Sequence, residues 1–254
     1  MARALDERPA LQGVANGSDP PRRQRSVAYE LGLQIVLVTA AALFYFAVRG
    51  LTEGDVDAAV ENGQSLLDLE ARFGLAMERS AQEWLIERRS LVTVANWVYI
   101  WGHWPVIIAS LVWLARRRHD DFVLLRNALF ASGAIGLVLF AVYPVAPPRL
   151  LPDAYVDTVT LYSESYRVLQ PPALVNKYAA MPSLHFGWNL LVGIFLVRTA
   201  TRSGLRMFGL IGPMLMAAAV VLTGNHYVVD VLVGGSVALL GLAIATGVSR
   251  PTSY

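Results

Sequence analysis

Long apolar runs are the feature that most constrains what this chain can fold into. The first covers residues 27–48. At roughly 20 residues, such a run is long enough to cross a hydrocarbon core of roughly 30 Å as a helix. Five more follow, at about residues 94–115, 122–143, 183–197, 207–223 and 227–248. The pattern therefore predicts an all-α fold, a transmembrane helical bundle of six spans.

The composition indicates the same class of protein. Of the 254 residues, 55% are hydrophobic and only 16% are charged, which is few charges for a soluble domain of this size. The chain has no cysteine, which excludes disulfide bonds and thiolate chemistry. Its arginines are scattered between the apolar runs and form no basic patch, so we expect no nucleic-acid partner.

The polar ends of the chain predict two tails. Residues 1–26 are polar and lack the apolar centre of a signal peptide, so we expect a disordered cytoplasmic tail there. Residues 27–248 are expected to form the six-span membrane domain. Residues 249–254 are expected to form a second cytoplasmic tail.

The segment between the first two spans, residues 52–89, combines helical periodicity with many acidic side chains. Its periodic apolar positions are Val56, Ala59, Val60, Leu66, Leu67 and Leu69. An apolar stripe on an otherwise charged helix is typical of a helix that lies at a surface. The segment therefore predicts one or two amphipathic helices outside the bilayer core, on the extracytoplasmic side.

Arginine placement predicts the orientation of the spans. In short loops, lysine and arginine are enriched on the cytoplasmic side. Clusters at residues 22–25, 116–118 and 198–206 all fall on one side of a six-span bundle, which is then cytoplasmic. An outer aromatic belt is expected at Trp97, Tyr99, Trp101 and Trp104. The chain is therefore predicted to be a multi-pass protein of the cell membrane with both termini in the cytoplasm.

Two of the apolar runs open with polar side chains that are unusual inside a bilayer. The stretch "MPSLH" carries Ser183 and His185, and the stretch "NHYVVD" carries His226 and Asp230. Ionisable residues within a span are costly, and they mark functional sites. Counting the spans places both histidines at the extracytoplasmic end of an inward-running helix. We therefore predict that they share one site on that side.

The spacing of His226 and Asp230 predicts a reactive histidine. Residues four apart lie on one face of a helix, where the carboxylate can accept a hydrogen bond from one ring nitrogen. The other ring nitrogen is then directed as a nucleophile or a base. His185 is the candidate acid that protonates a leaving oxygen. These three residues are the predicted catalytic set.

The surroundings of the histidines favour an anionic substrate. Helix N-termini carry free N–H groups and a positive dipole end, so two such ends facing each other form an anion site. Arg149, Lys177 and Ser183 add donors. Asn225, beside His226, is included among the substrate-binding candidates, although helix capping also explains it. Phosphate fits this setting better than a neutral group.

The two motifs resemble the second and third signatures of the type-2 phosphatidic acid phosphatase superfamily, which have the forms P-S-x-H and H-x-x-x-D on a six-span fold. The resemblance implies an enzyme of membrane lipids that cleaves a lipid phosphate and uses no metal or other cofactor. His226 would attack the phosphorus to give a phosphohistidine, and Asp230 would orient it. His185 would protonate the departing alcohol.

Three features depart from the usual pattern of that superfamily. Val220 stands where an arginine usually precedes the nucleophilic histidine, and Leu184 replaces a glycine. In the first motif, Arg149 is followed by leucine instead of proline, and Val142 holds a lysine position. The stretches "APPR", "PSLH" and "TGNHYVVD" are more similar to the inositol phosphorylceramide synthase-like branch, which can pass the phosphoryl group to an alcohol. Arg149 and Lys177 are then the replacement phosphate ligands.

Other functions stay open at this point. Two histidines and one carboxylate can also hold a metal ion as a facial triad. A non-catalytic lipid binder or scramblase is suggested by the missing arginine. Within the enzyme class, water and an alcohol are alternative acceptors, and the sequence does not indicate an oligomeric state.

We assign structural roles, and no catalytic role, to the remaining polar residues. His103, in "WGHWP", is interpreted as an interfacial histidine beside a kink at Pro105, and His119 as a cytoplasmic residue outside the site. Tyr227 is interpreted as an interfacial anchor. The acids of the outer loop are interpreted as solvated; they are Asp153, Asp157 and Glu164.

Overall fold

The computed structural model describes residues 27–51, 55–152, 155–163 and 176–248. The chain divides into two compact units, residues 1–37 and 38–254. The described residues of the first unit are helical and begin helix α1 (Val27–Leu51). Both predicted tails lie outside the described residues, as do Asp153 and Glu164 of the outer loop.

Throughout the described residues the regular structure is helical, which confirms the predicted all-α class. The helices after α1 are α2 (Val56–Arg72), α3 (Glu78–Ile86), α4 (Arg89–Trp101), α5 (Trp104–Arg117), α6 (His119–Val142), α7 (Thr158–Tyr162), α9 (Leu184–Thr199), α10 (Ser203–Leu222) and α11 (Val228–Val248). A 3₁₀ turn covers Pro148–Leu150. One isolated bridge pairs Val145 with Ala179, and it joins the two loops that lead into the site described below.

The helix lengths support a membrane protein. Three helices, α6, α10 and α11, are long and apolar enough to cross a bilayer. The pair α4 and α5 qualifies as a fourth span if it is one broken helix, and its two parts are bent by 44°. The sequence predicts a kink near Pro105, and the break lies directly before it, at Gly102 and His103. The apolar helical segments Gly32–Ala47 and Leu184–Thr199 are shorter, so six spans are not established by length and composition.

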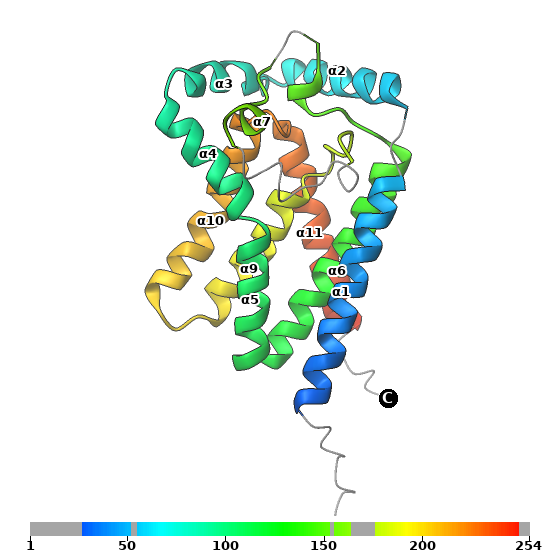
Figure 1. Ribbon diagram of the computed structural model, residues 1–254, viewed down its shortest axis with the longest axis vertical. Helices are drawn as coiled ribbons and strands as arrows, with labels where there is room; N and C mark the ends of the chain where they lie inside the picture. The colour runs from blue at the N-terminus through cyan, green and yellow to red at the C-terminus, as the bar shows by residue number, and fades with distance from the viewer. Residues whose placement is uncertain (1–26, 52–54, 153–154, 164–175, 249–254) are drawn as a thin grey trace, which may run out of the picture. The chain divides into compact units, whose positions relative to one another are not determined.

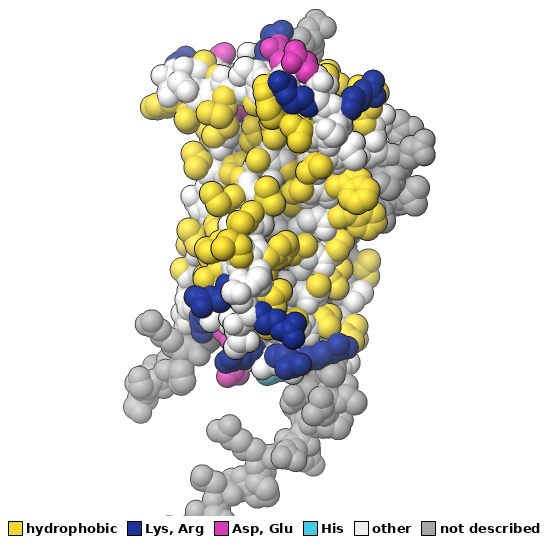
Figure 2. Space-filling model, turned by 90° about the vertical axis from the view of Figure 1, so that its left-hand side faces the viewer, with side chains coloured by type: hydrophobic (Ala, Val, Ile, Leu, Met, Phe, Trp, Pro, Cys, Tyr) yellow, Lys and Arg dark blue, Asp and Glu magenta, His cyan; other side chains and the backbone are white. Residues whose placement is uncertain are grey.

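The surface of the second unit has the distribution of side chains that a bilayer requires. Figure 2 shows hydrophobic side chains over the middle of one face, Lys and Arg side chains gathered along its lower edge, and Lys and Arg mixed with Asp and Glu at its upper end. Helix α10 exposes Leu205, Met207, Phe208, Leu210, Ile211, Met214 and Leu215. So many large apolar side chains on one exposed helix are costly in water, but lipid solvates them.

The arginine-rich ends of several helices lie together. Arg198, near the end of α9, forms an ion pair with Asp121 at the start of α6, with 3.2 Å between Nη2 and Oδ1. Asp121 closely follows the exposed cluster at residues 116–118, and Arg202 and Arg206 are also exposed. Two of the three predicted clusters are therefore at one end of the bundle. The third, at residues 22–25, lies outside the described residues.

The main apolar core lies between α5, α6, α9 and α11. Its most buried members include Leu125, Leu191, Phe195 and Ala238, each no more than 1% exposed. The packing of α9 against α10 and of α11 against α6 and α9 surrounds this core (Figure 1). This arrangement fixes the relative positions of the two helices that carry the predicted catalytic histidines.

Helices α2 and α3 lie across the end of the bundle where α11 begins (Figure 1). The prediction of helices in this segment is confirmed, but the predicted apolar stripe is only partly correct. Val56 and Leu69 are exposed. The stripe that is buried consists of Ala59, Gly63, Leu66 and Glu70. These positions follow a helical spacing and end at Glu70, a buried acid that contacts the start of α11.

Candidate functional site

Helices α9 and α11 approach each other closely at their N-terminal ends. The backbone N–H of Ser183 donates a hydrogen bond to the carbonyl oxygen of Asp230 at 3.1 Å. A Cβ atom on Gly234 would collide with the backbone of Ser183, and one on Gly187 would collide with the backbone of Gly234. Small residues at a helix interface allow backbones to approach in this way. The two glycines therefore allow His185 and His226 to lie near one another.

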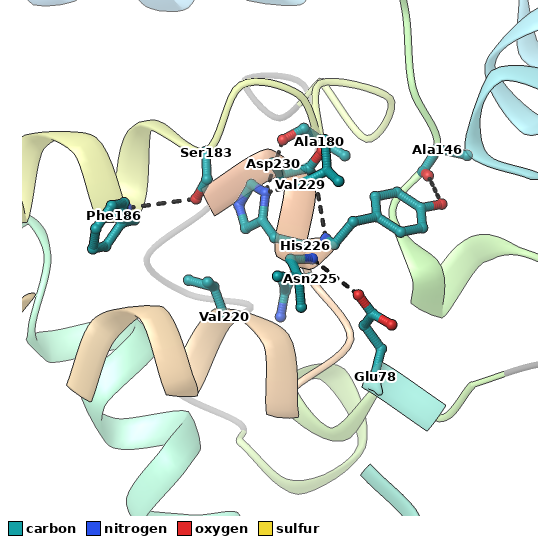
Figure 3. Close-up of polar contacts among 12 residues, drawn as sticks. Glu78, Ala146, Ala180, Ser183, Phe186, Val220, Asn225, His226, Val229 and Asp230 are labelled. Carbon is teal, nitrogen blue, oxygen red and sulfur yellow. Dashed lines mark hydrogen bonds and ion pairs between the residues drawn. The ribbon is translucent and has the colours of Figure 1, made fainter. Parts of the chain in front are cut away.

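The ring of His226 is held by two acceptors on one nitrogen. Its Nδ1 lies 2.8 Å from the carbonyl oxygen of Ala180 and 3.3 Å from Oδ2 of Asp230 (Figure 3). A carbonyl oxygen only accepts hydrogen bonds, so this pairing requires Nδ1 to carry the hydrogen. Nε2 is then left with its lone pair. That is the state a nucleophile or a general base requires.

Asp230 is fully buried one helical turn below His226. Its Oδ2 also accepts a hydrogen bond from the backbone N–H of Tyr227 at 3.1 Å. The carboxylate therefore contacts the ring and the backbone next to that ring. It fixes the orientation of His226, which is the role that the spacing of the two residues predicts.

His185 faces the same space from α9. Its ring centroid lies 5.8 Å from that of His226. The ring of Tyr99 stacks on His185 at 4.7 Å between centroids, and the ring of His103 lies at 4.2 Å. An imidazole from α9 and one from the loop directly before α11 therefore approach closely enough to contact one small anion between them.

A pocket that is open to the surface is lined by most of the predicted site residues. Both histidines line it, together with Arg149, Lys177 and Asn225. Ser183 does not line the pocket: it is fully buried, and its hydroxyl accepts a hydrogen bond from the N–H of Phe186 as the N-cap of α9. Its predicted contact with substrate is therefore indirect in this geometry.

Arg149 is positioned by the loops on either side of the pocket. Its backbone N–H donates to the carbonyl oxygen of Gly224 at 2.9 Å. Its Nε lies 3.3 Å from Oδ2 of Asp157, and the two side chains are 12% and 26% exposed. The interpretation of Asp157 as a solvated acid is therefore wrong, because Asp157 holds the guanidinium at the edge of the pocket.

Helices α3 and α4 fix the loop segment that carries Asp157. The amide of Gln82 donates to the carbonyl oxygen of Val156 at 2.9 Å and accepts from its N–H at 2.8 Å. The amide of Asn96 donates to the carbonyl oxygen of Thr158 at 2.9 Å and accepts from its hydroxyl at 3.1 Å. Paired contacts of this kind satisfy both groups of each buried amide.

The N-terminus of α11 is occupied by carboxylates. Oε1 of Glu78 accepts from the N–H of Val228 at 2.9 Å (Figure 3), and Oε1 of Glu70 accepts from the N–H of Val229 at 2.7 Å. The N–H of Tyr227 is already bonded to Asp230. The prediction that both helix ends are open to an anion is therefore wrong for α11. Arg149 and Lys177 are the cationic side chains among the described residues that line the pocket.

Glu70 and Glu78 form a buried acid pair, each no more than 1% exposed. Burial, together with a hydrogen bond to the neighbouring Glu78, raises the pKa of Glu70 to about 9. Within the described chain, the Oε2 atoms of both groups meet no N–H or O–H donor. A proton held on Glu70 lets its carboxyl group donate a hydrogen bond within the pair.

Several of these residues were not predicted from sequence. His103 is buried and lines the pocket, so its interpretation as an interfacial histidine is wrong. Tyr99 is buried beside His185 and is not part of the outer belt, whereas Trp97 is exposed. Tyr227 is also buried, and its hydroxyl donates to the carbonyl oxygen of Ala146 at 2.7 Å. The histidine directly before a predicted kink was the signal available for His103.

Val220 occupies the position where the superfamily usually has an arginine. It is fully buried, and it packs in an apolar cluster with Tyr99, Met216 and Ala219. Its carbonyl oxygen accepts from the N–H of His226 at 3.1 Å. The region below the nucleophile candidate is therefore apolar in this protein, and cationic side chains reach the pocket from the loops.

No three histidine, aspartate or glutamate side chains are arranged to hold a metal ion within the described residues. His185, His226 and Asp230 therefore do not form the facial triad considered above. Asp230 contacts the Nδ1 side of His226, as an orienting partner does.

Comparison with known families gives one match. A family model described as the PAP2 superfamily matches residues 64–244, more than half of the chain. The matched region contains every described pocket residue named above. Neither the curated proteins nor the solved structures give a match.

Proposed function

The chain belongs to the PAP2 superfamily, and from that premise we propose that it is a membrane-embedded lipid phosphatase that works through a phosphohistidine on His226. Membership supports a lipid phosphatase-like enzyme, and the residues of the pocket support the mechanism. The observation that carries the proposal is the 5.8 Å separation of the His185 and His226 rings in a pocket that also holds Arg149.

In the first step, Nε2 of His226 attacks the phosphorus of the lipid phosphate ester. A P–N bond forms, the P–O bond to the lipid alcohol breaks, and His185 gives its proton to the departing oxygen. Asp230 holds Nδ1–H and stabilises the positive charge that develops on the ring. Arg149 and Lys177 bind the negative oxygens of the phosphoryl group.

In the second step, water attacks the phosphohistidine. His185, now neutral, takes a proton from that water, so the P–N bond breaks as a new P–O bond forms. Inorganic phosphate leaves, and both histidines return to their starting states. His185 is therefore an acid in the first step and a base in the second, and the proton that it gives to the alcohol is replaced by one from water.

The motif departures extend the proposal to transfer. If an alcohol replaces water in the second step, the product is a phosphodiester when the transferred phosphoryl group carries a substituent. The resemblance to the inositol phosphorylceramide synthase-like branch predicts this outcome, with an alcohol as a second substrate. Both acceptors use the same first step.

We also propose that the protein is a six-span protein of the cell membrane, with α1 and α9 completing the bundle. Arginines gather at the end of the bundle opposite the pocket, and that end is cytoplasmic by the positive-inside rule. Both termini then lie in the cytoplasm, and the pocket opens on the extracytoplasmic side. Cysteine-accessibility labelling at Lys177 and Arg202 of intact cells tests this orientation, because labelling of Arg202→Cys from outside contradicts it.

The mechanism is tested with purified protein in detergent and a panel of lipid phosphates, with and without a chelator, with free phosphate and new phosphodiesters both measured. His226→Ala should lose about 10⁴-fold or more of the rate. His119→Ala, at the exposed cytoplasmic start of α6, is the matched control and should keep full activity. Acid-labile labelling of wild type but not of His226→Ala identifies the intermediate. Full activity in His226→Ala excludes this mechanism.

A further inference from the structure

A second cavity adjoins the histidine pocket and differs from it in character. It is an open hollow of about 180 Å³ between α1, α5 and α6, with one side chain from α9. Its lining is aliphatic and aromatic except for Arg126. The part of α1 that lines it begins at Val38, so the whole cavity belongs to the second unit.

The two cavities share a wall. Tyr45, Trp104 and Trp188 line both of them. The rings of Trp104 and Trp188 lie 5.5 Å apart, edge to face, and Tyr45 contacts Trp188 at 5.9 Å between centroids. The two cavities therefore lie against the same three rings, within the reach of one lipid molecule.

The depth of the second cavity matches one leaflet of a bilayer. Along α6, its lining residues run from Leu137 toward the cytoplasmic end, as far as Arg126. Eleven residues of α-helix rise about 16 Å. That is close to half of the roughly 30 Å hydrocarbon core. A lipid with its phosphate at the outer end of the bundle has hydrocarbon chains that extend over this depth.

The hollow exists because small residues line it. Ala41 and Ala42 on α1 face it, as do Gly133 and Ala134 on α6. A Cβ atom on Gly133 would lie only 3.2 Å from the ring of Trp188. A larger side chain at these positions would fill the space that the cavity now provides.

We propose that this cavity binds a hydrocarbon chain of the same lipid whose phosphate group is cleaved at His226, an inference that rests on the proposed function. Burying apolar surface of the chain there supplies binding energy away from the reacting phosphorus. Arg126 ends the apolar lining on the cytoplasmic side, with its guanidinium bonded to Asn127 at 2.8 Å and 3.1 Å. The cavity therefore favours chains about one leaflet long.

The test fills the cavity and compares two substrates. Ala134→Phe places a ring in the cavity, and Ala218→Phe, at an exposed alanine of α10 outside both cavities, is the matched control. For a long-chain phosphatidic acid, Ala134→Phe should lower kcat/KM about tenfold or more relative to the control, since each displaced methylene contributes several-fold. For p-nitrophenyl phosphate, which has no chain, the two variants should differ by less than about threefold. An equal effect on both substrates overturns the proposal.

A binding measurement separates this inference from the proposed function. In the His226→Ala background, a stoichiometric amount of phosphatidic acid with brominated chains should quench tryptophan fluorescence, because Trp104 and Trp188 line the cavity. Adding Ala134→Phe should remove much of this quenching, whereas Ala218→Phe should not. Ala42→Leu fills the cavity from α1 and repeats the test if Ala134→Phe does not fold. If Ala134→Phe removes the quenching but the protein with His226 intact has no phosphatase activity, the proposed function is rejected and the chain site stands. If Ala134→Phe leaves the quenching unchanged, the chain site is rejected and the proposed function stands.

Discussion

The N-terminal ends of α9 and α11 each carry a histidine of the pocket, but they are held in different ways. At α11, three backbone N–H groups donate to carboxylates, from Glu70, Glu78 and Asp230. At α9, the cap is the neutral hydroxyl of Ser183. The ring of His226 is oriented by two acceptors, whereas the ring of His185 lies among other rings.

The difference agrees with the two roles proposed for the histidines, a nucleophile at His226 and an acid at His185. A nucleophile must keep one ring nitrogen aimed at phosphorus throughout the reaction, and carboxylates that hold both ring and backbone meet that need. The ring of His185 is positioned by the rings of Tyr99 and His103, which lie 4.7 Å and 4.2 Å from it between centroids. The same carboxylates also remove α11 as an anion site, which leaves the substrate charge to side chains.

The strongest test of this comparison is Asp230→Asn. The amide keeps the size of the side chain but removes the negative charge that stabilises the ring as Nε2 attacks, whereas the carbonyl oxygen of Ala180 is unchanged. We expect kcat to fall about 10⁴-fold with the fold retained. Asp121→Asn, in the ion pair with Arg198 at the other end of the bundle, is the control for carboxylate loss. A loss of less than about tenfold in Asp230→Asn contradicts an orienting role.

Next in size is His185→Ala, which separates the acid from the nucleophile. With a lipid alcohol as leaving group, we expect kcat to fall about 10²–10⁴-fold. With p-nitrophenol, which leaves without protonation, the first step should be nearly unaffected, so burst kinetics should persist. His226→Ala should show no burst with either substrate. Loss of the burst in both variants would make the two histidines equivalent.

A smaller effect is expected at Arg149, which we propose binds the phosphate group because the N-terminus of α11 is occupied. Arg149→Gln should raise KM for a lipid phosphate about tenfold, the size of one charge-assisted hydrogen bond. Asp157→Asn removes the partner of Arg149 but keeps the cation, so KM should change by less than about threefold. If the two variants behave alike, the ion pair matters and the contact with phosphate does not.

The smallest effect concerns pH and the acid pair below α11. The pKa of Glu70 is about 9 in the folded protein and 4.5 ordinarily, so the folded state holds an extra proton between these values. This contribution to stability is complete below pH 4.5 and is lost as the pH rises through about 9. Glu70→Gln mimics the protonated acid, and the thermal midpoint should fall less steeply from pH 7 to 10.

The control for that measurement is Glu83→Gln on the same surface, where Glu83 is exposed and paired with Arg79. Its midpoint should follow the wild-type profile with pH. A Glu70→Gln profile that also follows wild type would mean that the pair does not share a proton. Each kcal/mol of stability should correspond to roughly 2–4 °C of midpoint.

The parts of the molecule that could be predicted from sequence depend on local patterns. Apolar runs predict helices, and the four-residue spacing of His226 and Asp230 predicts their contact, which forms although His226 lies two residues before α11 begins. Glu70 and Glu78 could not be placed in this way. They meet Val229 and Val228 across 159 and 150 residues of chain, and only the assembled fold brings them together.

The span count shows a different limit. The hydropathy pattern predicts an apolar span at residues 183–197. In the structure Ser183 is the N-cap of α9, and the helix has 16 residues. The run at residues 94–115 is apolar throughout, yet it divides at His103 into two helices. A hydropathy pattern reports which residues tolerate lipid, and it does not report where backbone hydrogen bonding is interrupted.

Gly187 and Gly234 also set the limits within which this site can change. The distance between the two imidazole rings depends on the absence of a side chain at both glycines. It therefore cannot be adjusted in small steps by replacing one side chain with a slightly larger one. Even a methyl would act as a spacer and push the rings apart as a unit. We therefore expect substrate preference to vary through substitutions in the loops and in the second cavity, while the distance between the two rings stays constant.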